Sequence, residues 1–320
     1  LLMPLSIQNN SLSALNHRHL SSSKSTNSEL LEALQAGKLD SNDKQLLTAE
    51  TQTAGRGQHT RSWQSPPGNV YLSLYHPINT PISGLLSLMI GLELAKMPII
   101  QALNTQLKAQ NKTPIGVKWA NDLGFYPLHK QDLGFDLNDN SLIAFNKLAG
   151  ILIEPVWIAS KLKGVVIGVG LNVAATPKLT EQTLEGMSYQ AISLQDIHES
   201  INKDAKDNPL ESLPSLSIIY EQISQALLDA VVCFKAISAA KSHVQPSSTQ
   251  YAMAQFYREF TPQDALKGLR VRITQNLNNN EHVIEGRACG IDTNGCLQLQ
   301  QDNGNISALF TGRIDVINET

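Results

Sequence analysis

The sequence predicts an α+β protein, with helices packed on a β-sheet in a large domain and a small β-barrel at the C-terminus. Three observations support this fold class. Strand-like and helical stretches follow one another in the first half of the chain, and two apolar strand-like runs lie in the middle. From Leu266 onward the pattern is β, with turn sequences between short strands. We therefore divide the chain into a domain of residues 1–262 and a barrel of residues 263–320.

Composition sets the outer limits of this prediction. A chain of 320 residues is long enough for both domains, and 42% hydrophobic with 17% charged residues indicates a soluble globular protein. The net charge of −3 argues against a broad attraction to nucleic acid. Three cysteines without metal-ligand spacing indicate reduced thiols in a cytoplasmic protein. No signal peptide is expected, and the oligomeric state stays open, a homodimer included.

The first predicted elements lead up to a glycine-rich loop. A short strand is expected within residues 12–20, and a helix over residues 25–37 that ends at a glycine. Thr26 and Glu29 of this helix fit a capping box, in which each side chain bonds a backbone N–H at the helix start. A strand over residues 45–50 then runs into the loop.

Further strands and two helices are predicted after the loop. Residues 70–76 alternate between apolar and polar, which is typical of a half-buried strand. Residues 82–97 form a long helix, and the charged residues within this apolar stretch favour a buried helix over a membrane span. Pro98 begins a second helical piece, and a short strand covers residues 115–119.

Two apolar strands are expected to pair in the middle of the chain, over residues 148–155 and 164–173. Residues 196–214 are polar and interrupted, which we interpret as a surface segment. Helices follow over residues 216–234 and 249–260. The first of these helices carries an apolar stripe at helical spacing, which predicts a buried face formed by Ile219, Ile223, Leu227 and Val231.

The C-terminal barrel is predicted from its strands and turns. Asn294-Gly295 and Asn303-Gly304 are strong hairpin turns, because both residue types tolerate a positive φ. The strands that these turns would connect are expected over residues 271–274, 282–291, 296–300 and 305–310.

The loop over residues 52–63 is the first candidate for a binding site. Gly55 and Gly57 would let the backbone take a positive φ and bring its N–H groups close to an anion. Arg56 and Arg61 add forked donors for a carboxylate or phosphate, and Trp63 offers a flat face for a ring. The alternative interpretation is a flexible surface loop, because short glycine-rich matches are weak on their own.

Three later segments favour the binding site. They are Lys118-Trp-Ala-Asn-Asp122, Lys147-Leu-Ala-Gly-Ile-Leu-Ile-Glu154 and Gly168-Val-Gly-Leu-Asn172. Together with the loop and with Ser25-Thr26-Asn27, they resemble the catalytic domain of biotin protein ligases. The resemblance implies a class II synthetase-like mixed sheet with helices on one side, followed by an SH3-like barrel.

The resemblance also implies a reaction. Biotin and ATP, with Mg²⁺, would give biotinyl-5′-AMP, and the biotinyl group would pass to a lysine of the biotin carboxyl carrier domain of acetyl-CoA carboxylase. The residues implied in catalysis are Lys147, Arg56 and Asp122, with Asp122 as a metal ligand. Those implied in biotin binding are Ser25, Thr26, Asn27, Gln52, Gly55, Arg56, Gly57, Gln58, Lys147 and Gly150. Those implied in nucleotide binding are Arg61, Trp63, Lys118, Asn121 and Asn172.

Each of the main residues also has a structural interpretation. Thr26 could simply cap its helix, Asp122 could be a turn residue before a glycine, and Lys147 could be a solvated lysine at a strand start. Trp119 is interpreted as a core residue. The two glycines of Gly168-Val-Gly170 lie inside a strand pattern, so they are expected to let a ligand lie flat on the sheet, not to form a dinucleotide-binding turn.

Three alternatives bound the functional hypothesis. Lipoate–protein ligases and octanoyltransferases share the expected fold, and a non-catalytic biotin sensor would need the same binding pocket. Some biotin protein ligases carry an N-terminal DNA-binding domain, and we expect none before Ser25 and no direct nucleic acid binding. The segment over residues 124–146 resembles an insertion and is assigned no chemistry.

One position departs from the family pattern. The loop commonly has a further arginine where this chain has Gln58, and a basic residue or glycine near His59 and Thr60. Glutamine donates a hydrogen bond but has no charge, so we expect looser retention of the adenylate intermediate, with Arg61 as a partial substitute.

Overall fold

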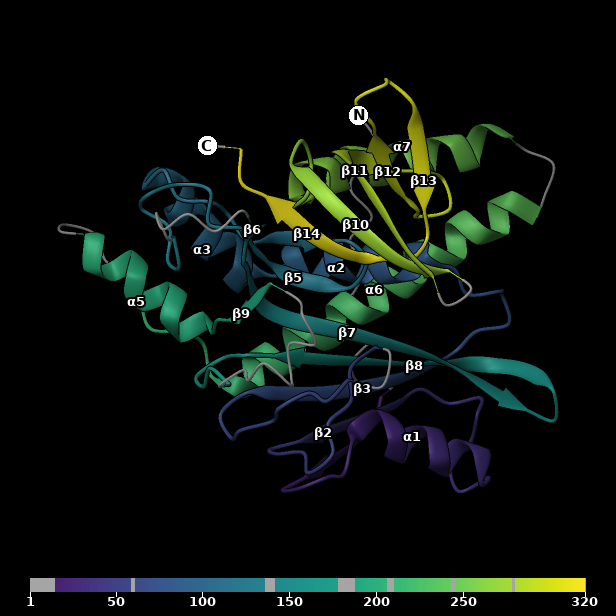
Figure 1. The fold of residues 1–320 in the computed structure, drawn as a ribbon. Coiled ribbons are helices and arrows are strands. Elements are labelled where there is room, and N and C mark those ends of the chain that lie inside the picture. Colours follow the sequence, from purple (N-terminus) through teal and green to yellow (C-terminus); the bar gives the residue numbers. More distant parts are fainter. Residues whose placement is uncertain are drawn as a thin grey trace, which may run out of the picture.

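The chain forms two β-sheets, one of eight strands and one of six, with helices packed on the larger sheet (Figure 1). This architecture is seen in a computed structural model. The residues that it describes are 15–58, 61–135, 142–177, 188–205, 210–242, 246–277 and 280–319.

The larger sheet is mixed, as predicted. Its strand order is β1-β2-β3-β8-β7-β5-β4, and β9 pairs with β7. The β1–β2 and β7–β9 pairs are parallel and the others antiparallel. The strands are β1 Asn16–Leu20, β2 Gln45–Ala49, β3 Val70–Pro77, β4 Gly116–Lys118, β5 Asp122–Phe125, β7 Phe145–Ile158, β8 Lys161–Leu171 and β9 Tyr189–Ala191.

The predicted pair of apolar strands is the long hairpin β7–β8. Its two-residue turn, Ala159-Ser160, has a positive φ at both positions, 47° and 59°. Two successive left-handed residues give a turn whose twist matches the right-handed twist of the strands. The hairpin therefore carries both glycine-bearing motifs of the middle of the chain on neighbouring strands.

The helices lie on both faces of this sheet, so the expectation of helices on one side is wrong. Helix α1 (Thr26–Gln35) packs its Leu30 and Leu34 against one face, in a cluster that includes Tyr75 of β3. The next residue toward the N-terminus, Leu74, belongs to the main core on the opposite face. Strand β3 is consequently buried on both faces, and its predicted half exposure is wrong as well.

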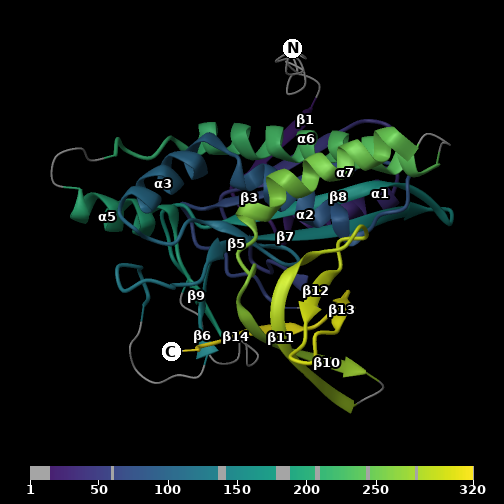
Figure 2. The same cartoon turned by 90° about the horizontal axis from the view of Figure 1, so that it is seen from above.

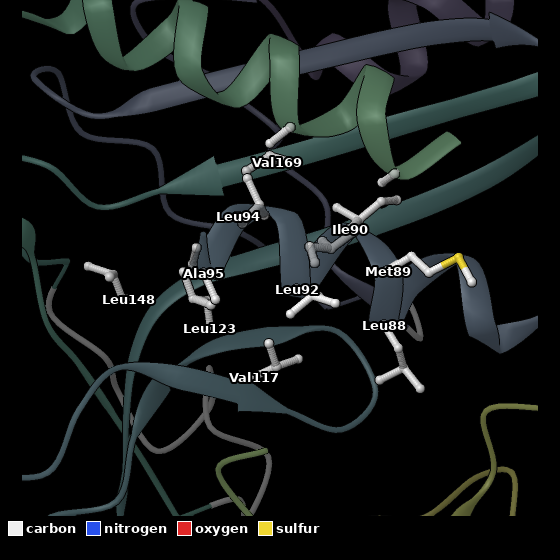
Figure 3. Close-up of a cluster of buried hydrophobic side chains, with 14 of the residues drawn as sticks. Leu88, Met89, Ile90, Leu92, Leu94, Ala95, Val117, Leu123, Leu148 and Val169 are labelled. Atoms are coloured by element: carbon white, nitrogen blue, oxygen red, sulfur yellow. The ribbon is translucent and has the colours of Figure 1, made fainter. Parts of the chain in front are cut away.

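Helix α2 (Gly84–Ala95) lies in the centre of the main core. Figure 3 shows its leucine, isoleucine and methionine side chains pointing in several directions, toward the sheet strands and toward other helices. A helix that is apolar all round must be covered all round, which confirms a buried helix in place of a membrane span. Helix α3 (Pro98–Ala109) starts at the predicted proline.

Helices α6 (Leu216–Ser242) and α7 (Pro246–Phe260) cover this core from outside (Figure 2). By length and apolar composition α6 could cross a membrane, but many of its apolar residues are buried inside the protein. The four residues of the predicted apolar stripe are all fully buried, which confirms that prediction: Ile219, Ile223, Leu227 and Val231.

A short amphipathic helix lies where a surface segment was expected. Helix α5 (Leu194–Asp204) buries Leu194, Ile197 and Ile201. Its start is a capping box, in which the Ser193 side chain accepts from the backbone of Asp196 and the Asp196 carboxylate accepts from the backbone of Ser193. The sequence Ser-Leu-Gln-Asp before an apolar repeat is the pattern that indicates this helix.

The second sheet has the order β13-β12-β11-β10-β14-β6. Its turns at Gly295 and Gly304 have φ of +82° and +85°, which confirms the two predicted hairpin turns. Strand β14 was not expected, and neither was β6. The SH3-like character of this part stays a prediction. Its strands are β10 Arg270–Leu277, β11 Asn280–Ile291, β12 Leu297–Gln300, β13 Ile306–Leu309, β14 Arg313–Ile317 and β6 Leu142–Ile143.

The second sheet is attached to the first at several points. Strand β6, which leads into β7, pairs with β14. The Trp119 indole donates to the carbonyl of Gly295 at 2.8 Å, and Trp119 is buried, as expected of a core residue. The backbone N–H of Ala265 donates to the carbonyl of Val117 at 3.0 Å. The C-terminal part of the chain therefore supports the strands that carry the site.

Candidate active site

One pocket brings together most of the residues predicted for the site. It lies where the loop after β2 and the start of α1 face β7, β8 and β9. The predicted residues that line it are Ser25, Thr26, Asn27, Gln52, Arg56, Gly57, Gln58, Arg61, Trp63, Asn121, Asp122, Lys147, Gly150 and Asn172. Gly55 and Lys118 do not line it. His59 and Thr60 of the loop lie outside the described residues.

The start of α1 forms one end of the pocket. Ser25 occupies the N-cap position and its side chain makes no capping hydrogen bond, so the predicted capping box of Thr26 and Glu29 is wrong. The Thr26 hydroxyl and backbone N–H instead donate to the Gln52 side-chain oxygen, at 3.2 and 2.9 Å. Gln52 donates in turn to Ser65 at 3.0 Å. Helix start and loop are thus joined by one amide group.

Ser73 of β3 lies buried behind this end of the pocket, does not line it, and was missed by the sequence analysis. Its buried hydroxyl lies 2.7 Å from the Thr26 hydroxyl and 2.6 Å from the Asn27 side-chain oxygen. In the sequence, Ser73 looks like one of the polar residues of an alternating strand. Burial of β3 on both faces turns it into a member of a polar cluster that suits a hydrogen-bonding ligand head.

The loop is a tight hairpin. The backbone N–H of Trp63 donates to Gly55 at 2.8 Å, and that of Gly57 donates to Arg61 at 2.7 Å. These two N–H groups are therefore used inside the loop and do not point at an anion. Neither glycine has a positive φ. Gly55 is required for another reason, since a β-carbon there would lie 2.4 Å from the Trp63 carbonyl oxygen.

Arg56 points from the loop onto the hairpin strand β7 and the helix α1. Its guanidinium pairs with the Glu154 carboxylate at 2.6 Å and donates to the Ser28 hydroxyl at 2.9 Å. The other Glu154 oxygen accepts from Asn27 at 3.0 Å. Glu154 lies in a predicted motif, but its role as the partner of Arg56 was missed. To hold an anionic ligand, Arg56 has to share or leave this carboxylate.

A glycine platform forms the floor of the pocket. Gly150 of β7 and Gly170 of β8 are paired across the hairpin. The Trp63 ring lies over them, because a β-carbon at Gly170 would be 2.5 Å from its Cε2 atom and one at Gly150 would be 3.0 Å from its Cζ3 atom. The protein's own Trp63 ring therefore lies on the sheet here, and Asn27 covers Gly168, so the expectation that these glycines let a ligand lie flat stays a prediction. That Trp63 covers a nucleotide stays a prediction.

Lys147 and Asp122 form an ion pair at the edge of this platform. The Lys147 ammonium lies 2.8 Å from the Asp122 carboxylate and 5.4 Å from the centre of the Trp63 ring. Only 21% of the Lys147 side chain is exposed, so the interpretation as a solvated lysine is wrong. Asp122 begins β5 and is buried, so the interpretation as a turn residue is wrong too.

Lys118 lies behind the pocket wall. It is only 2% exposed, and its ammonium donates to the Tyr189 hydroxyl at 2.7 Å. The Tyr189 hydroxyl donates to Asp122 at 2.9 Å. Burial lowers the pKa of Lys118 to about 7, against the opposing attraction of the Asp122 carboxylate. Direct contact between Lys118 and a nucleotide does not fit this position, and Tyr189, which lines the pocket, was missed.

The two asparagines predicted to bind the nucleotide hold backbone in place. Asn121 donates to the carbonyl of Ile151 at 2.9 Å. Asn172 donates to the carbonyl of Ile192 at 3.1 Å, and its buried side-chain oxygen has no partner within the described chain. Asn172 therefore keeps one unused acceptor at the pocket, whereas the amide nitrogen of Asn121 is used by the fold.

The donor set does not suit a metal ion held by the protein. Asp122 faces the Lys147 ammonium and accepts from Tyr189. Within the described ranges, no three His, Cys, Asp or Glu side chains gather where they could hold a metal. Mg²⁺ prefers several oxygen ligands, so the predicted role of Asp122 as a metal ligand does not fit this geometry.

Comparison with known proteins agrees with this geometry. Residues 20–172 match the biotin/lipoate A/B protein ligase family. Over 153 residues the chain is 36% identical to the bifunctional ligase/repressor BirA of Salmonella typhimurium. The aligned stretch covers 47% of this chain and 38% of that protein. Over 158 residues the chain is 34% identical to the biotin–[acetyl-CoA-carboxylase] ligase of Mycobacterium tuberculosis, which covers 48% of each. The chain thus spans less than half the length of these relatives.

A solved structure extends the likeness of fold to nearly the whole chain. The biotin protein ligase of Aquifex aeolicus, determined in complex with biotin and ATP, superposes with a TM-score of 0.57 at 19% identity. The superposition covers 95% of this chain and 99% of that one. It confirms the mixed sheet with packed helices that the sequence predicts.

Proposed function

We propose that this protein is an ATP-dependent biotin–protein ligase, because residues 20–172 match the biotin/lipoate A/B protein ligase family. It would join the biotin carboxylate to the α-phosphate of ATP, release pyrophosphate, and transfer the biotinyl group to a lysine. The acceptor that we propose is the biotin carboxyl carrier domain of acetyl-CoA carboxylase.

One observation carries this proposal: Arg56 and Lys147, from a loop and a strand, line the same pocket. The first step brings a carboxylate against a polyphosphate, and the two anions repel each other. Cations placed in advance offset this repulsion and stabilise the charge that develops on the phosphoryl oxygens. Lys147 is the better placed of the two, because it stands on a long strand and is held by a buried carboxylate.

The rest of the pocket suggests where each part of the substrates binds. Thr26 and Gln52, which line the pocket, offer donors and acceptors to the ureido ring of biotin, and the buried Ser73 hydroxyl holds Thr26 from behind. The glycine platform and Trp63 suit the flat apolar parts of a ligand. With the ureido ring at the helix end, the biotin chain would run past the Trp63 ring, which covers the platform, and place its carboxylate near Lys147.

The second step needs only an amine and a protected anhydride. The acceptor ε-amine attacks the acyl carbon of biotinyl-5′-AMP, and AMP leaves with the bonding electrons while the amine loses a proton. Water would hydrolyse the anhydride, so the loop over the pocket would serve to keep water out. Mg²⁺ would arrive bound to the phosphates of ATP, and we assign it no side chain of this protein.

Biotin-dependent release of pyrophosphate from ATP tests the proposal, followed by transfer to a purified carrier domain. We expect Lys147→Ala to fold and to lower the rate about 10²-fold or more, the usual cost of losing a pre-placed catalytic donor. Lys161→Ala, at an exposed end of β8, is the matched control and should keep full activity.

The choice of acid separates biotin ligation from the related activities. Lipoate and octanoate should support little pyrophosphate release in the same assay. A higher rate with either acid would assign the protein to lipoate or octanoate ligation. Tight binding of biotin without pyrophosphate release would identify a biotin sensor and would contradict the proposal.

A further inference from the structure

A chain of four polar side chains runs from the protein interior to the pocket. The buried Lys118 ammonium donates to the Tyr189 hydroxyl at 2.7 Å. That hydroxyl donates to one Asp122 oxygen at 2.9 Å, and the other Asp122 oxygen lies 2.8 Å from the Lys147 ammonium. The four residues lie on four different strands, in the order β4, β9, β5 and β7.

The inner end of this chain cannot touch a ligand. Lys118 is 2% exposed and lies inside a cage of aromatic rings. Its ammonium is 4.0 Å from the centre of the Tyr189 ring, 5.0 Å from that of Phe145 and 5.9 Å from that of Tyr126. An ammonium has donors only, and the hydrogen bond that places it in this network is the one to the Tyr189 hydroxyl. Any effect of Lys118 on the pocket must therefore pass through its neighbours.

The Lys118 ammonium, which can only donate, sets the direction of the hydrogen bonds along this chain of side chains. Because Lys118 donates to Tyr189, the single hydroxyl proton of Tyr189 is left for Asp122. One carboxylate oxygen is thus fixed by a rigid phenol on β9. The carboxylate can then turn only its other oxygen toward Lys147.

This arrangement matters because a lysine side chain is long and flexible. Four rotatable bonds allow the ammonium of Lys147 many positions, and only those near the platform can meet a ligand carboxylate. A carboxylate that is itself held in place restricts the ammonium to one region of the pocket. Because the Lys147 ammonium is already held in place, its side chain loses less conformational entropy when the substrates react.

We propose that Tyr189 and Lys118 are positioning residues, which hold Asp122 so that Asp122 in turn holds the Lys147 ammonium over the glycine platform. This inference rests on the proposed function, in which Lys147 assists the attack of biotin on ATP. Neither residue contacts the reacting atoms. Tyr189 acts through one hydrogen bond, and Lys118 acts by fixing the direction of that bond.

The chain offers a matched pair of variants for the test. Tyr189→Phe removes the hydroxyl that joins Lys118 to Asp122 and leaves the ring in the cage. Tyr126→Phe removes a hydroxyl from another ring of the same cage, and that hydroxyl is buried without a hydrogen-bond partner in the described chain. Both changes delete one oxygen atom from a buried tyrosine near the same lysine.

We expect Tyr189→Phe to lower kcat for biotin-dependent pyrophosphate release by about tenfold or more, the factor that one hydrogen bond to a charged group supplies. Its affinity for biotin should stay within error of the wild type, and its melting temperature should fall, because the buried Lys118 ammonium and the Asp122 carboxylate each lose a hydrogen bond. Tyr126→Phe should keep the full rate. Lys118→Met should reproduce the loss of Tyr189→Phe if it folds.

A double-mutant cycle shows whether Tyr189 acts through Lys147. In a Lys147→Ala background, Tyr189→Phe should cause no further loss of kcat, because the group that it positions is already gone. If Tyr189→Phe lowers kcat by the same factor in the Lys147→Ala background as in the wild type, the proposal is overturned. A wild-type rate for Tyr189→Phe would also overturn it, as would an equal loss of rate in Tyr126→Phe.

The outcome for the wild-type protein separates this proposal from the proposed function. If the wild type releases no pyrophosphate with biotin, the proposed function fails. If the wild type is active and Tyr189→Phe equals it, the proposed function stands and only the positioning role is rejected.

Discussion

The glycine platform under Trp63 predicts the effect of adding a single methyl group to the pocket floor. In Gly170→Ala, the new β-carbon would stand 2.5 Å from the Cε2 atom of Trp63. Two carbon atoms in contact normally stay about 3.5 Å apart, so the ring must move away by about 1 Å. Because Trp63 closes the loop hairpin through its backbone, a shift of its ring also displaces the loop.

The magnitude follows from the cost of overpacking. Forcing an extra methyl group into a packed site costs about 1–3 kcal/mol. A cost of this size lowers the population of the docked loop about 5- to 150-fold. If pyrophosphate release needs the docked loop, kcat/KM should fall within that range, while the strand itself should fold.

Substitutions at two further glycines test whether the loss depends on how close the new β-carbon comes to its neighbours. A β-carbon at Gly150 would lie 3.0 Å from the Trp63 ring, a contact that a small shift relieves, so Gly150→Ala should lose less than Gly170→Ala. A β-carbon at Gly84, at the start of α2, would meet nothing closer than 4.0 Å. Gly84→Ala is therefore the control and should match the wild type.

The assays are pyrophosphate release and the NMR signal of the Trp63 indole N–H, which reports the ring position without relying on activity. In a Trp63→Ala background, Gly170→Ala should cost nothing more, because the ring that it strikes is absent. If Gly170→Ala leaves both the signal and the rate unchanged, the platform has no role in holding the loop.

Three other predictions concern the loop, acid stability and one helix. Gln58→Arg should lower the leakage of biotinyl-AMP to free amines, because it adds a charged donor in the loop; equal leakage from both proteins would remove the idea. Burial lowers the pKa of His76 from 6.5 to about 4, so the unfolded chain takes up this proton first and stability is lost as pH falls below 6.5. The loss should reach about 2 kcal/mol at pH 5, measured as a shift of the urea midpoint relative to pH 7.5, and a His76→Gln variant should lack this share. Ser193→Ala should cost about 1 kcal/mol by removing the cap of α5, with Ser217→Ala, outside any such cap, as the neutral comparison in thermal melts.

The sequence was most informative where a motif lies on a regular strand. The resemblance of their motifs to biotin protein ligases predicted that Lys147 and Asp122 share a site, and the structure places them on paired strands. Helix α6 was predicted equally well, because its apolar stripe has helical spacing over several turns.

The contacts that were missed join segments far apart in the chain. Tyr189 reaches Asp122 only because β9 pairs with β7, and no local pattern predicts that pairing. Ser73 looked like a solvated residue because the covering of β3 by α1 depends on where that helix packs. Local periodicity reports one face of a strand, whereas burial on the other face is set by the rest of the fold.

The pairing of β6 with β14 connects the far end of the chain with the candidate reaction centre. Val316 is in register with Ile143, which lies four residues before Lys147 on the continuation of the same extended segment. A destabilising substitution in β14, though remote in sequence, would release the N-terminal end of β7, the strand that carries Lys147. A substitution near residue 316 can therefore lower activity without changing acceptor recognition. The reason is that β14 also holds the N-terminal end of the strand that carries Lys147.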